Sequence, residues 1–132
     1  MSYMLDTNIC IYAIKNKPEQ VLINLHKHIN DGLYISSITL AELFHGIQKS
    51  SNIEKNTKAL TQILALLEVL PFDDTCALEY GYIRAYLEKR GTPIGNMDIL
   101  IASHAKAKEM TLVTNNTKEF IRVPNLKIEN WV

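Results

Sequence analysis

The sequence is poor in cysteine, in long apolar runs and in any excess of charge of one sign. Its only cysteines, Cys10 and Cys76, have apolar neighbours, which is typical of buried free thiols and not of a disulfide framework. No apolar run reaches the roughly 18 residues of a membrane span, and the first residues lack the basic and apolar regions of a secretory signal. We therefore expect a cytoplasmic protein that makes no contact with a membrane.

The charge balance bears on nucleic-acid binding. Lys plus Arg equals Asp plus Glu, 14 against 14. Proteins that bind nucleic acid usually have a basic excess, because phosphate contacts supply much of their affinity. A chain without net charge therefore has no general electrostatic attraction to a polyanion. It remains compatible with a site that meets phosphate through a bound cation, since such a site needs acidic residues.

The pattern of apolar residues predicts the fold class. A chain of 132 residues with 47% hydrophobic content is expected to form a single domain spanning residues 1–132. Strands are predicted at Tyr3–Leu5, Leu33–Ser36, Val69–Phe72, Thr111–Thr114 and Leu126–Ile128. Helical spacing lies between them, around Val21–Ile29, Leu40–Ile47 and Leu60–Leu67, from about Thr75 to Lys89, and from Asn96 onward. Such alternation predicts an α/β fold with a parallel sheet covered by helices on both faces.

Acidic residues stand where the predicted helices begin. Asp6 follows the first strand, and Glu42 and Asp98 lie in the first turns of two later helices. Asn116 and Glu119 follow the fourth strand. Ligands of open parallel sheets bind outside the carboxyl ends of the strands. Asp6, Glu42 and the pair Asn116 and Glu119 are therefore expected at one end of the sheet.

Each acid also has a purely structural explanation. Asp6 can cap a helix, Thr39 and Glu42 fit a capping box, and Asp98 can complement a helix dipole. Taken together the acids repel one another, by on the order of 4 kcal/mol for two charges 4 Å apart at an effective dielectric near 20. A divalent cation removes that penalty, and Mg²⁺ or Mn²⁺ favours oxygen ligands. We therefore expect Asp6, Glu42 and Asp98 to hold a metal ion.

The histidines offer little support for other chemistries. Glu42 and His45 form one Glu-x-x-His unit, whereas a di-iron bundle needs two, so His45 is expected to be a partly buried packing residue. His26 and His28 are expected on an exposed helix face, and His104, six residues after Asp98, points elsewhere on its helix. The chain has no zinc-protease motif, Gly-rich phosphate loop or serine-hydrolase motif. A histidine-pair ribonuclease that uses the 2′-hydroxyl stays an alternative without a second signal.

Four blocks of sequence resemble the PIN-domain family. They are Met4–Asn8, Ser36–Leu43, Gly95–Ala102 and Leu112–Phe120, and they occur in the family's order and spacing over almost the whole chain. Within that family the chain is similar to the VapC toxins of bacterial type II toxin–antitoxin systems, some of which cut initiator tRNA in its anticodon stem-loop. Lys15–Pro18 and Gly91–Gly95 resemble the same branch.

The resemblance carries several implications. It implies a three-layer α/β/α fold with a central five-stranded parallel sheet, commonly assembled as a homodimer. It implies an endoribonuclease that depends on Mg²⁺ or Mn²⁺ and is inhibited by a VapB-type antitoxin, whose tail fills the active-site groove. In one respect this chain departs from the family, because Asn116 stands where many PIN domains carry Asp.

The expected mechanism is metal-assisted phosphodiester hydrolysis at Asp6, Glu42 and Asp98. Further candidates for the site, each with capping or turn formation as an equal alternative, are Thr7, Asn8, Thr114, Asn116 and Glu119. Candidates for contact with the RNA backbone are Lys15, Lys17, Arg84, Lys89 and Arg90. Two rival interpretations remain: a non-catalytic RNA- or protein-binding module, and a metal-dependent DNase on the same site.

Overall fold

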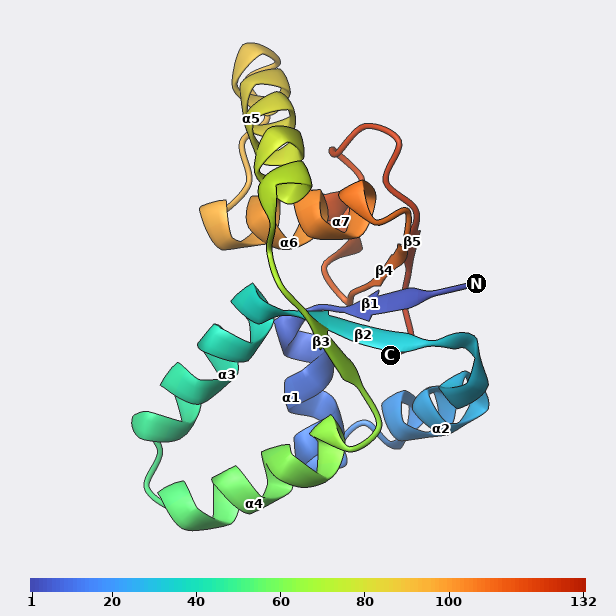
Figure 1. Cartoon of the computed structure of the whole chain (residues 1–132), viewed down its shortest axis with the longest axis vertical. Coiled ribbons are helices and arrows are strands. Elements are labelled where there is room, and N and C mark those ends of the chain that lie inside the picture. The colour runs from blue at the N-terminus through green and yellow to red at the C-terminus, as the bar shows by residue number, and fades with distance from the viewer.

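Five parallel strands form the centre of the molecule. The computed structural model describes residues 1–132. The strands are β1 (Tyr3–Leu5), β2 (Leu33–Ser36), β3 (Glu68–Leu70), β4 (Thr111–Val113) and β5 (Ile128–Glu129), in the spatial order β3-β2-β1-β4-β5. Every neighbouring pair is parallel. The predicted α/β fold with a parallel sheet is confirmed, and the sheet lies between two layers of helices (Figure 1).

The helices divide between the two faces of the sheet. One layer holds α1 (Thr7–Lys15), α2 (Glu19–Lys27), α3 (Ser37–Gln48) and α4 (Ile53–Leu64), and the other holds α5 (Asp74–Lys89), α6 (Asn96–Ala107) and α7 (Thr117–Phe120). Figure 1 shows α5 projecting from the body of the molecule across α6. No helix combines the length and apolar character needed to cross a membrane.

Alternating side chains of the strands supply two separate cores. Tyr3 and Leu5 pack with α1–α4 in a cluster of 15 buried residues, whereas Met4 packs with α5–α7 in a cluster of 11. In β4, Val113 joins the first cluster and Leu112 the second. This is the two-residue period of a strand that is buried on both faces. Because helices pack on both faces of the sheet, the sheet fixes the position of one helix layer relative to the other.

The strand order fixes where a ligand site is expected. From β1 the chain proceeds outward through β2 to β3, and then crosses to β4 and β5 on the other side of β1. The order therefore reverses between β1 and β4, and open α/β sheets bind ligands in the crevice outside the carboxyl ends of the strands at such a point. Asp6 and Thr114 directly follow these two strands.

The predicted positions of β1 and β2 are confirmed, whereas three other strands differ from prediction. β3 begins at Glu68 and ends at Leu70, and β4 ends at Val113. β5 is Ile128–Glu129 and not Leu126–Ile128, because it pairs with β4 through Leu112 and Val113, whatever the hydrophobicity of its own residues. Both cysteines are free and buried, as expected.

Candidate active site

Asp6 stands at the end of β1 and is almost completely buried, with 5% of its surface exposed. Its backbone N–H donates to the carbonyl of Val113 at 3.0 Å, and its carboxylate accepts from the backbone N–H of Ile9 at 2.9 Å. Asp6 is therefore the N-cap of α1, as its structural explanation requires. Burial raises the pKa of this carboxyl and the charge of Glu42 raises it further, against the opposing effects of the Thr114 hydroxyl and the Ile9 amide.

Glu42 projects from α3 toward the start of α1. Its Oε1 accepts a hydrogen bond from Thr7 Oγ1 at 2.5 Å. The predicted capping box is wrong: the N-cap of α3 is Ser36, whose Oγ accepts from the backbone N–H of Ile38, and Thr39 lies buried inside the helix. Glu42 therefore caps no helix, and the Thr7 hydroxyl holds its carboxylate.

Asp98 lies in the first turn of α6 and makes no capping hydrogen bond. Its pKa is raised to about 6, first by burial and then by the negative charges of Glu119, Asp6 and Glu42. Carboxylates from four separate segments are therefore near enough to one another for their charges to act on Asp98. An ionised Asp98 has no cation beside it to offset this repulsion.

Five of the predicted site residues line one cavity of about 170 Å³. They are Asp6, Thr7, Asn8, Glu42 and Asp98, and they include no Lys, Arg or His. The donor chemistry is that of an Mg²⁺ or Mn²⁺ site, since carboxylate and amide oxygens are the ligands these ions prefer. No three of the acids yet surround a single point closely enough to ligate one ion. The residues that line the cavity fit such a cation in their chemistry.

The other predicted residues border the site without lining the cavity. Thr114 is buried, and its hydroxyl accepts from the backbone N–H of Asn116 at 2.9 Å, which shapes the loop after β4. Asn116 precedes α7 without a side-chain cap, and Glu119 lies in the single turn of that helix. Two of them act on the acids of the cavity: the Thr114 hydroxyl lowers the pKa of Asp6, and the charge of Glu119 raises the pKa of Asp98. The loop after β4 therefore contributes the negative charge of Glu119 to the site, but none of its side chains lines the cavity.

The structure corrects what was expected of His45 and His28, whereas His104 points away from the acidic cavity, as predicted. His45 is exposed and does not pack in a core, whereas the exposed position of His26 is confirmed. His28 is half-buried and stacks on Trp131, with ring centroids 4.9 Å apart. His104 is completely buried, as its apolar neighbours Ile101 and Ala105 would have indicated. None of the four lines the acidic cavity.

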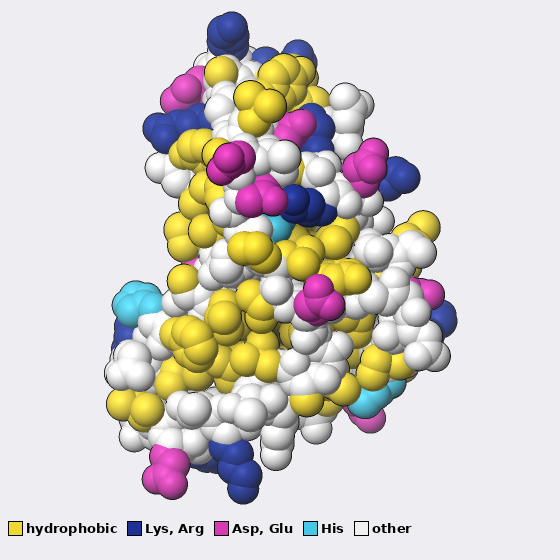
Figure 2. Space-filling model, in the orientation of Figure 1, with side chains coloured by type: hydrophobic (Ala, Val, Ile, Leu, Met, Phe, Trp, Pro, Cys, Tyr) yellow, Lys and Arg dark blue, Asp and Glu magenta, His cyan; other side chains and the backbone are white.

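An apolar groove adjoins the cavity and was not foreseen from the sequence. It encloses about 310 Å³ between α1, α3 and α4, with Ile11, Ile14, Leu43 and Ile47 among its lining residues. Figure 2 shows hydrophobic side chains gathered on the face between α3 and α4. Glu42 lines both the groove and the acidic cavity, so the two adjoin at this residue.

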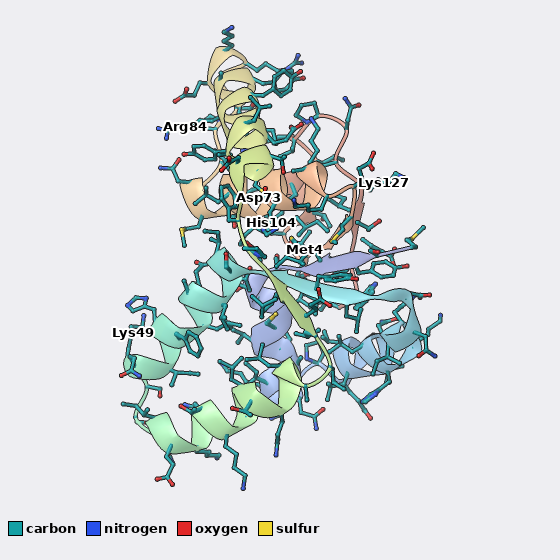
Figure 3. The ribbon with its side chains drawn as sticks, in the orientation of Figure 1. Met4, Lys49, Asp73, Arg84, His104 and Lys127 are labelled. Carbon is teal, nitrogen blue, oxygen red and sulfur yellow. The ribbon has the colours of Figure 1, made fainter.

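The predicted basic residues lie in two separate places. Lys15 lines the far part of the groove and, with Lys17 and Lys55, an adjoining hollow of about 450 Å³. Arg84, Lys89 and Arg90 lie on or directly after the projecting helix α5 (Figure 3 labels Arg84). No basic residue lies in the wall of the acidic cavity.

Comparison with known proteins agrees with this geometry. The PIN-domain family model matches residues 3–126. The chain is 52% identical over 132 residues to a Ribonuclease VapC2 of Rickettsia felis, covering 99% of this chain and 98% of the relative. It is 44% identical over 131 residues to a tRNA(fMet)-specific endonuclease VapC of Salmonella typhimurium, with the same coverage.

A solved structure shows the same fold over the full length. The crystal structure of VapBC2 from Rickettsia felis bound to a DNA fragment from their promoter contains a chain that superposes with a TM-score of 0.96 at 50% identity, over 100% of both chains. The family model, the full-length relatives and this superposition point the same way. This chain belongs to the PIN-domain family, among the VapC ribonucleases that are the toxins of VapBC toxin–antitoxin modules.

Proposed function

We propose that the acidic cavity is the catalytic centre of an endoribonuclease, where Asp6, Glu42 and Asp98 hold Mg²⁺ or Mn²⁺. One observation carries the proposal: acids from three separate elements line a cavity that has no basic residue in its wall, and their repulsion contributes to raising the pKa of Asp98 to about 6. Such an arrangement costs stability unless a cation is bound. A metal of this kind, when bound, lowers the pKa of a water and stabilises charge on the phosphate.

The surrounding residues orient this centre. Thr7 donates its hydroxyl proton to Glu42 and so fixes the direction of that carboxylate. Asn8 is exposed in the cavity wall at the start of α1, where the helix N-terminus favours a phosphate oxygen. Thr114 holds the loop that carries Asn116 and Glu119. Burial keeps bulk water from Asp6, which gives that carboxylate a fixed orientation.

The proposed substrate is tRNA, and specifically initiator tRNA in its anticodon stem-loop. The support is similarity: relatives from Salmonella typhimurium and Shigella flexneri, 44% and 43% identical, are named tRNA(fMet)-specific endonucleases. Lys15 and Lys17 flank the groove that leads away from the acids, and they are suited to contact phosphates beyond the cut.

The direct test is cleavage of initiator tRNA, with elongator methionine tRNA and a DNA copy of the stem-loop as controls. We expect cleavage of the initiator alone, dependent on Mg²⁺ or Mn²⁺, with 5′-phosphate and 3′-hydroxyl ends. A cyclic-phosphate product that persists in EDTA would contradict the metal mechanism. Metal-independent binding without cleavage would favour the binding module, and cutting of the DNA copy would favour the DNase.

The proposed partner is a VapB-type antitoxin whose tail lies in the apolar groove. The groove would take apolar side chains of the tail, and the acids beside Glu42 would take a cationic one. Gly46 lines the groove and has open space around its Cα, so Gly46→Leu should fill the groove and weaken binding of the co-expressed antitoxin. Gly46→Ala is the matched control and should bind normally. Equal binding by both variants would place the tail elsewhere.

The proposed assembly is a homodimer through the projecting helix. Leu78 and Tyr82 lie one turn apart on α5 and are 78% and 58% exposed, so together they form an exposed apolar patch that a second copy could cover. Light scattering should give twice the chain mass for the purified protein, and Leu78→Glu should reduce it to one. A monomeric wild-type protein would refute the dimer.

A further inference from the structure

One buried histidine has no part in the acidic cavity. His104 of α6 is completely buried, and its Nδ1 lies 2.7 Å from Ser36 Oγ. The ring of Phe72 meets it edge-on, with centroids 5.7 Å apart. Figure 3 shows His104 where α6 passes over the sheet, near Asp73 at the start of α5. A polar contact in such a place costs desolvation and calls for an explanation.

Ser36 connects His104 to a second helix. It is the last residue of β2 and the N-cap of α3, and its Oγ accepts from the backbone N–H of Ile38 at 3.1 Å. The same oxygen is therefore bound by α3 and by α6, although the two residues are 68 positions apart in the chain. The bond joins the start of α3 to the body of α6.

Counting protons decides which form of His104 is present. If the ring proton is on Nε2, Ser36 donates its hydroxyl proton to Nδ1, and only the Nε2–H lacks a partner. If the proton is on Nδ1, both the Ser36 hydroxyl proton and the Nε2 lone pair lack partners. Each unpaired buried donor or acceptor is costly, so the first form is favoured. Ser36 is then the donor and a neutral His104 the acceptor.

Burial and the balance of the nearby charges keep the His104 ring neutral. Burial and the positive charge of Lys108 lower the pKa of His104, against a smaller opposing effect of Asp73. Lys108 and Asp73 pair with each other at 2.6 Å. The hydrogen bond with Ser36 therefore persists throughout the neutral pH range.

The two joined helices carry two of the three acids. Glu42 lies six residues after Ser36, and Asp98 lies six residues before His104. Six helical residues span about 9 Å, so each acid stands about the same distance from the bond. A change in the spacing of the helices at this bond would reach both carboxylates together.

We propose that His104 is a positioning residue, which through Ser36 fixes the spacing of α3 and α6, and so the spacing of the backbone positions that carry Glu42 and Asp98, the proposed ligands of a divalent cation. The inference rests on the proposed function, since it takes these acids as the metal ligands. His104 touches neither the substrate nor the metal, and acts only through the two helices.

The test compares two conservative substitutions with one control. An Asn at this position offers a polar atom where Nδ1 stands, whereas a Gln offers one where Nε2 stands, so His104→Asn keeps the bond with Ser36 and His104→Gln loses it. The control is Ser103→Ala, which removes a buried hydrogen bond of the same helix, to Ile99, that joins no other element.

The readouts are the dissociation constant for Mn²⁺, by calorimetry on the antitoxin-free protein, and kcat and KM for RNA. We expect His104→Gln to weaken Mn²⁺ binding and lower kcat by about 3–10-fold with KM unchanged, somewhat below the roughly 10–100-fold effect of a group that touches a metal ligand directly. His104→Asn should recover most of the loss, and Ser103→Ala should match the wild type.

Three outcomes would overturn the proposal. One is unchanged Mn²⁺ binding in His104→Gln, which would make the histidine a packing residue. Another is equal weakening by Ser103→Ala or by His104→Asn, which would make the effect one of general stability. The third is failure of the wild-type protein to bind Mn²⁺, which would refute the metal site itself and this proposal with it.

If His104→Gln does not fold, Ser36→Ala removes the same bond from the other side and must weaken Mn²⁺ binding in its place.

Discussion

Asp73 and Asp98 are both acids at the start of a helix, yet their surroundings shift their pKa values in opposite directions. Asp73 caps α5 and pairs with Lys108 at 2.6 Å, and this partner together with Thr75 holds its pKa far below the usual range. Asp98 is half-buried among other acids, and its pKa is raised to about 6. The sequence gives no sign of this difference, because each is simply an acid at a helix start.

The comparison separates a structural acid from the acid that we propose binds a metal. Asp73 satisfies the orphan N–H groups of its helix and has its own cation within the chain. Asp98 caps nothing and has no cation, so its charge reduces stability in the isolated protein. A site that costs stability in the absence of its ligand is what a metal-dependent enzyme requires, since the bound ion recovers that cost.

The largest effect is expected from the three acids of the cavity. Asp6→Asn, Glu42→Gln and Asp98→Asn should each reduce RNA cleavage by at least about 100-fold, because each removes a proposed metal ligand. Without metal, the thermal midpoint of Asp98→Asn should hold or rise, since the substitution relieves repulsion. Asp6→Asn keeps an N-cap oxygen for Ile9, so α1 should persist.

Cleavage rate and thermal midpoint are to be measured together on the same preparations, in EDTA and in Mg²⁺. Mg²⁺ should raise the midpoint of the wild type and not that of the variants. Full activity in any one variant would remove that residue from the site. Unfolding of all three would show that the acids are needed for the fold and would leave their metal role without support.

An intermediate effect is expected from the loop after β4. Glu119→Gln should weaken Mg²⁺ activation by about 10-fold, because Glu119 exerts the largest charge effect on Asp98 and is proposed to hold a metal-bound water. Asn116→Asp should tighten activation by restoring the acid that many PIN domains carry. A titration of cleavage rate with Mg²⁺ measures both. If Glu119→Gln follows the wild-type curve, the site works with three carboxylates.

The two aspartates should give opposite dependences of stability on pH. The folded-state pKa of Asp98 is raised from 3.8 to about 6, so metal-free stability should fall as pH rises through this interval and stay low above it. The folded-state pKa of Asp73 is lowered, so its contribution is present above about pH 4 and is lost as pH falls further. Urea unfolding between pH 3 and 7 in EDTA, on wild type, Asp98→Asn and Asp73→Asn, measures both slopes. The fall should be smaller in Asp98→Asn, where only the raised pKa of Asp6 remains, and an undiminished fall in that variant would contradict the assignment.

Strand and helix positions could be predicted where local pattern and tertiary pairing agree. β1 and β2 are short apolar segments, and a helix begins directly after Asp6, which follows β1, and after Ser36, which ends β2. β5 could not be placed, because its pairing with Leu112 and Val113 decides its position. Thr39 and Ser36 are both good caps by type, and only the geometry at the end of β2 chooses Ser36.

The site could be predicted as a set of residues but not as an arrangement. Asp6, Glu42 and Asp98 do line one cavity, as four blocks in family order implied. The bond from Thr7 to Glu42 joins residues 35 positions apart, and that from Ser36 to His104 joins residues 68 positions apart. No local pattern reports contacts of that separation, so both were missed. The apolar groove depends likewise on how three helices pack.

The smallest effect is expected from the structural acid, and it divides into two parts. Asp73→Ala removes both the cap of α5 and the pair with Lys108, whereas Asp73→Asn keeps an oxygen for the amides of Thr75 and Cys76, and Lys108→Met removes only the pair. The thermal midpoint should therefore fall most in Asp73→Ala and by smaller, similar amounts in the other two, because exposed ion pairs contribute little. Raising the salt concentration should shrink the difference between wild type and Lys108→Met but not the loss in Asp73→Ala, since a cap is less screened than a pair. RNA cleavage should stay within about twofold of wild type in all three, because none of them lines the acidic cavity. A large loss of cleavage in Lys108→Met with little loss of stability would show that this pair acts on the site through His104, and would end the separation of a structural acid from a functional one.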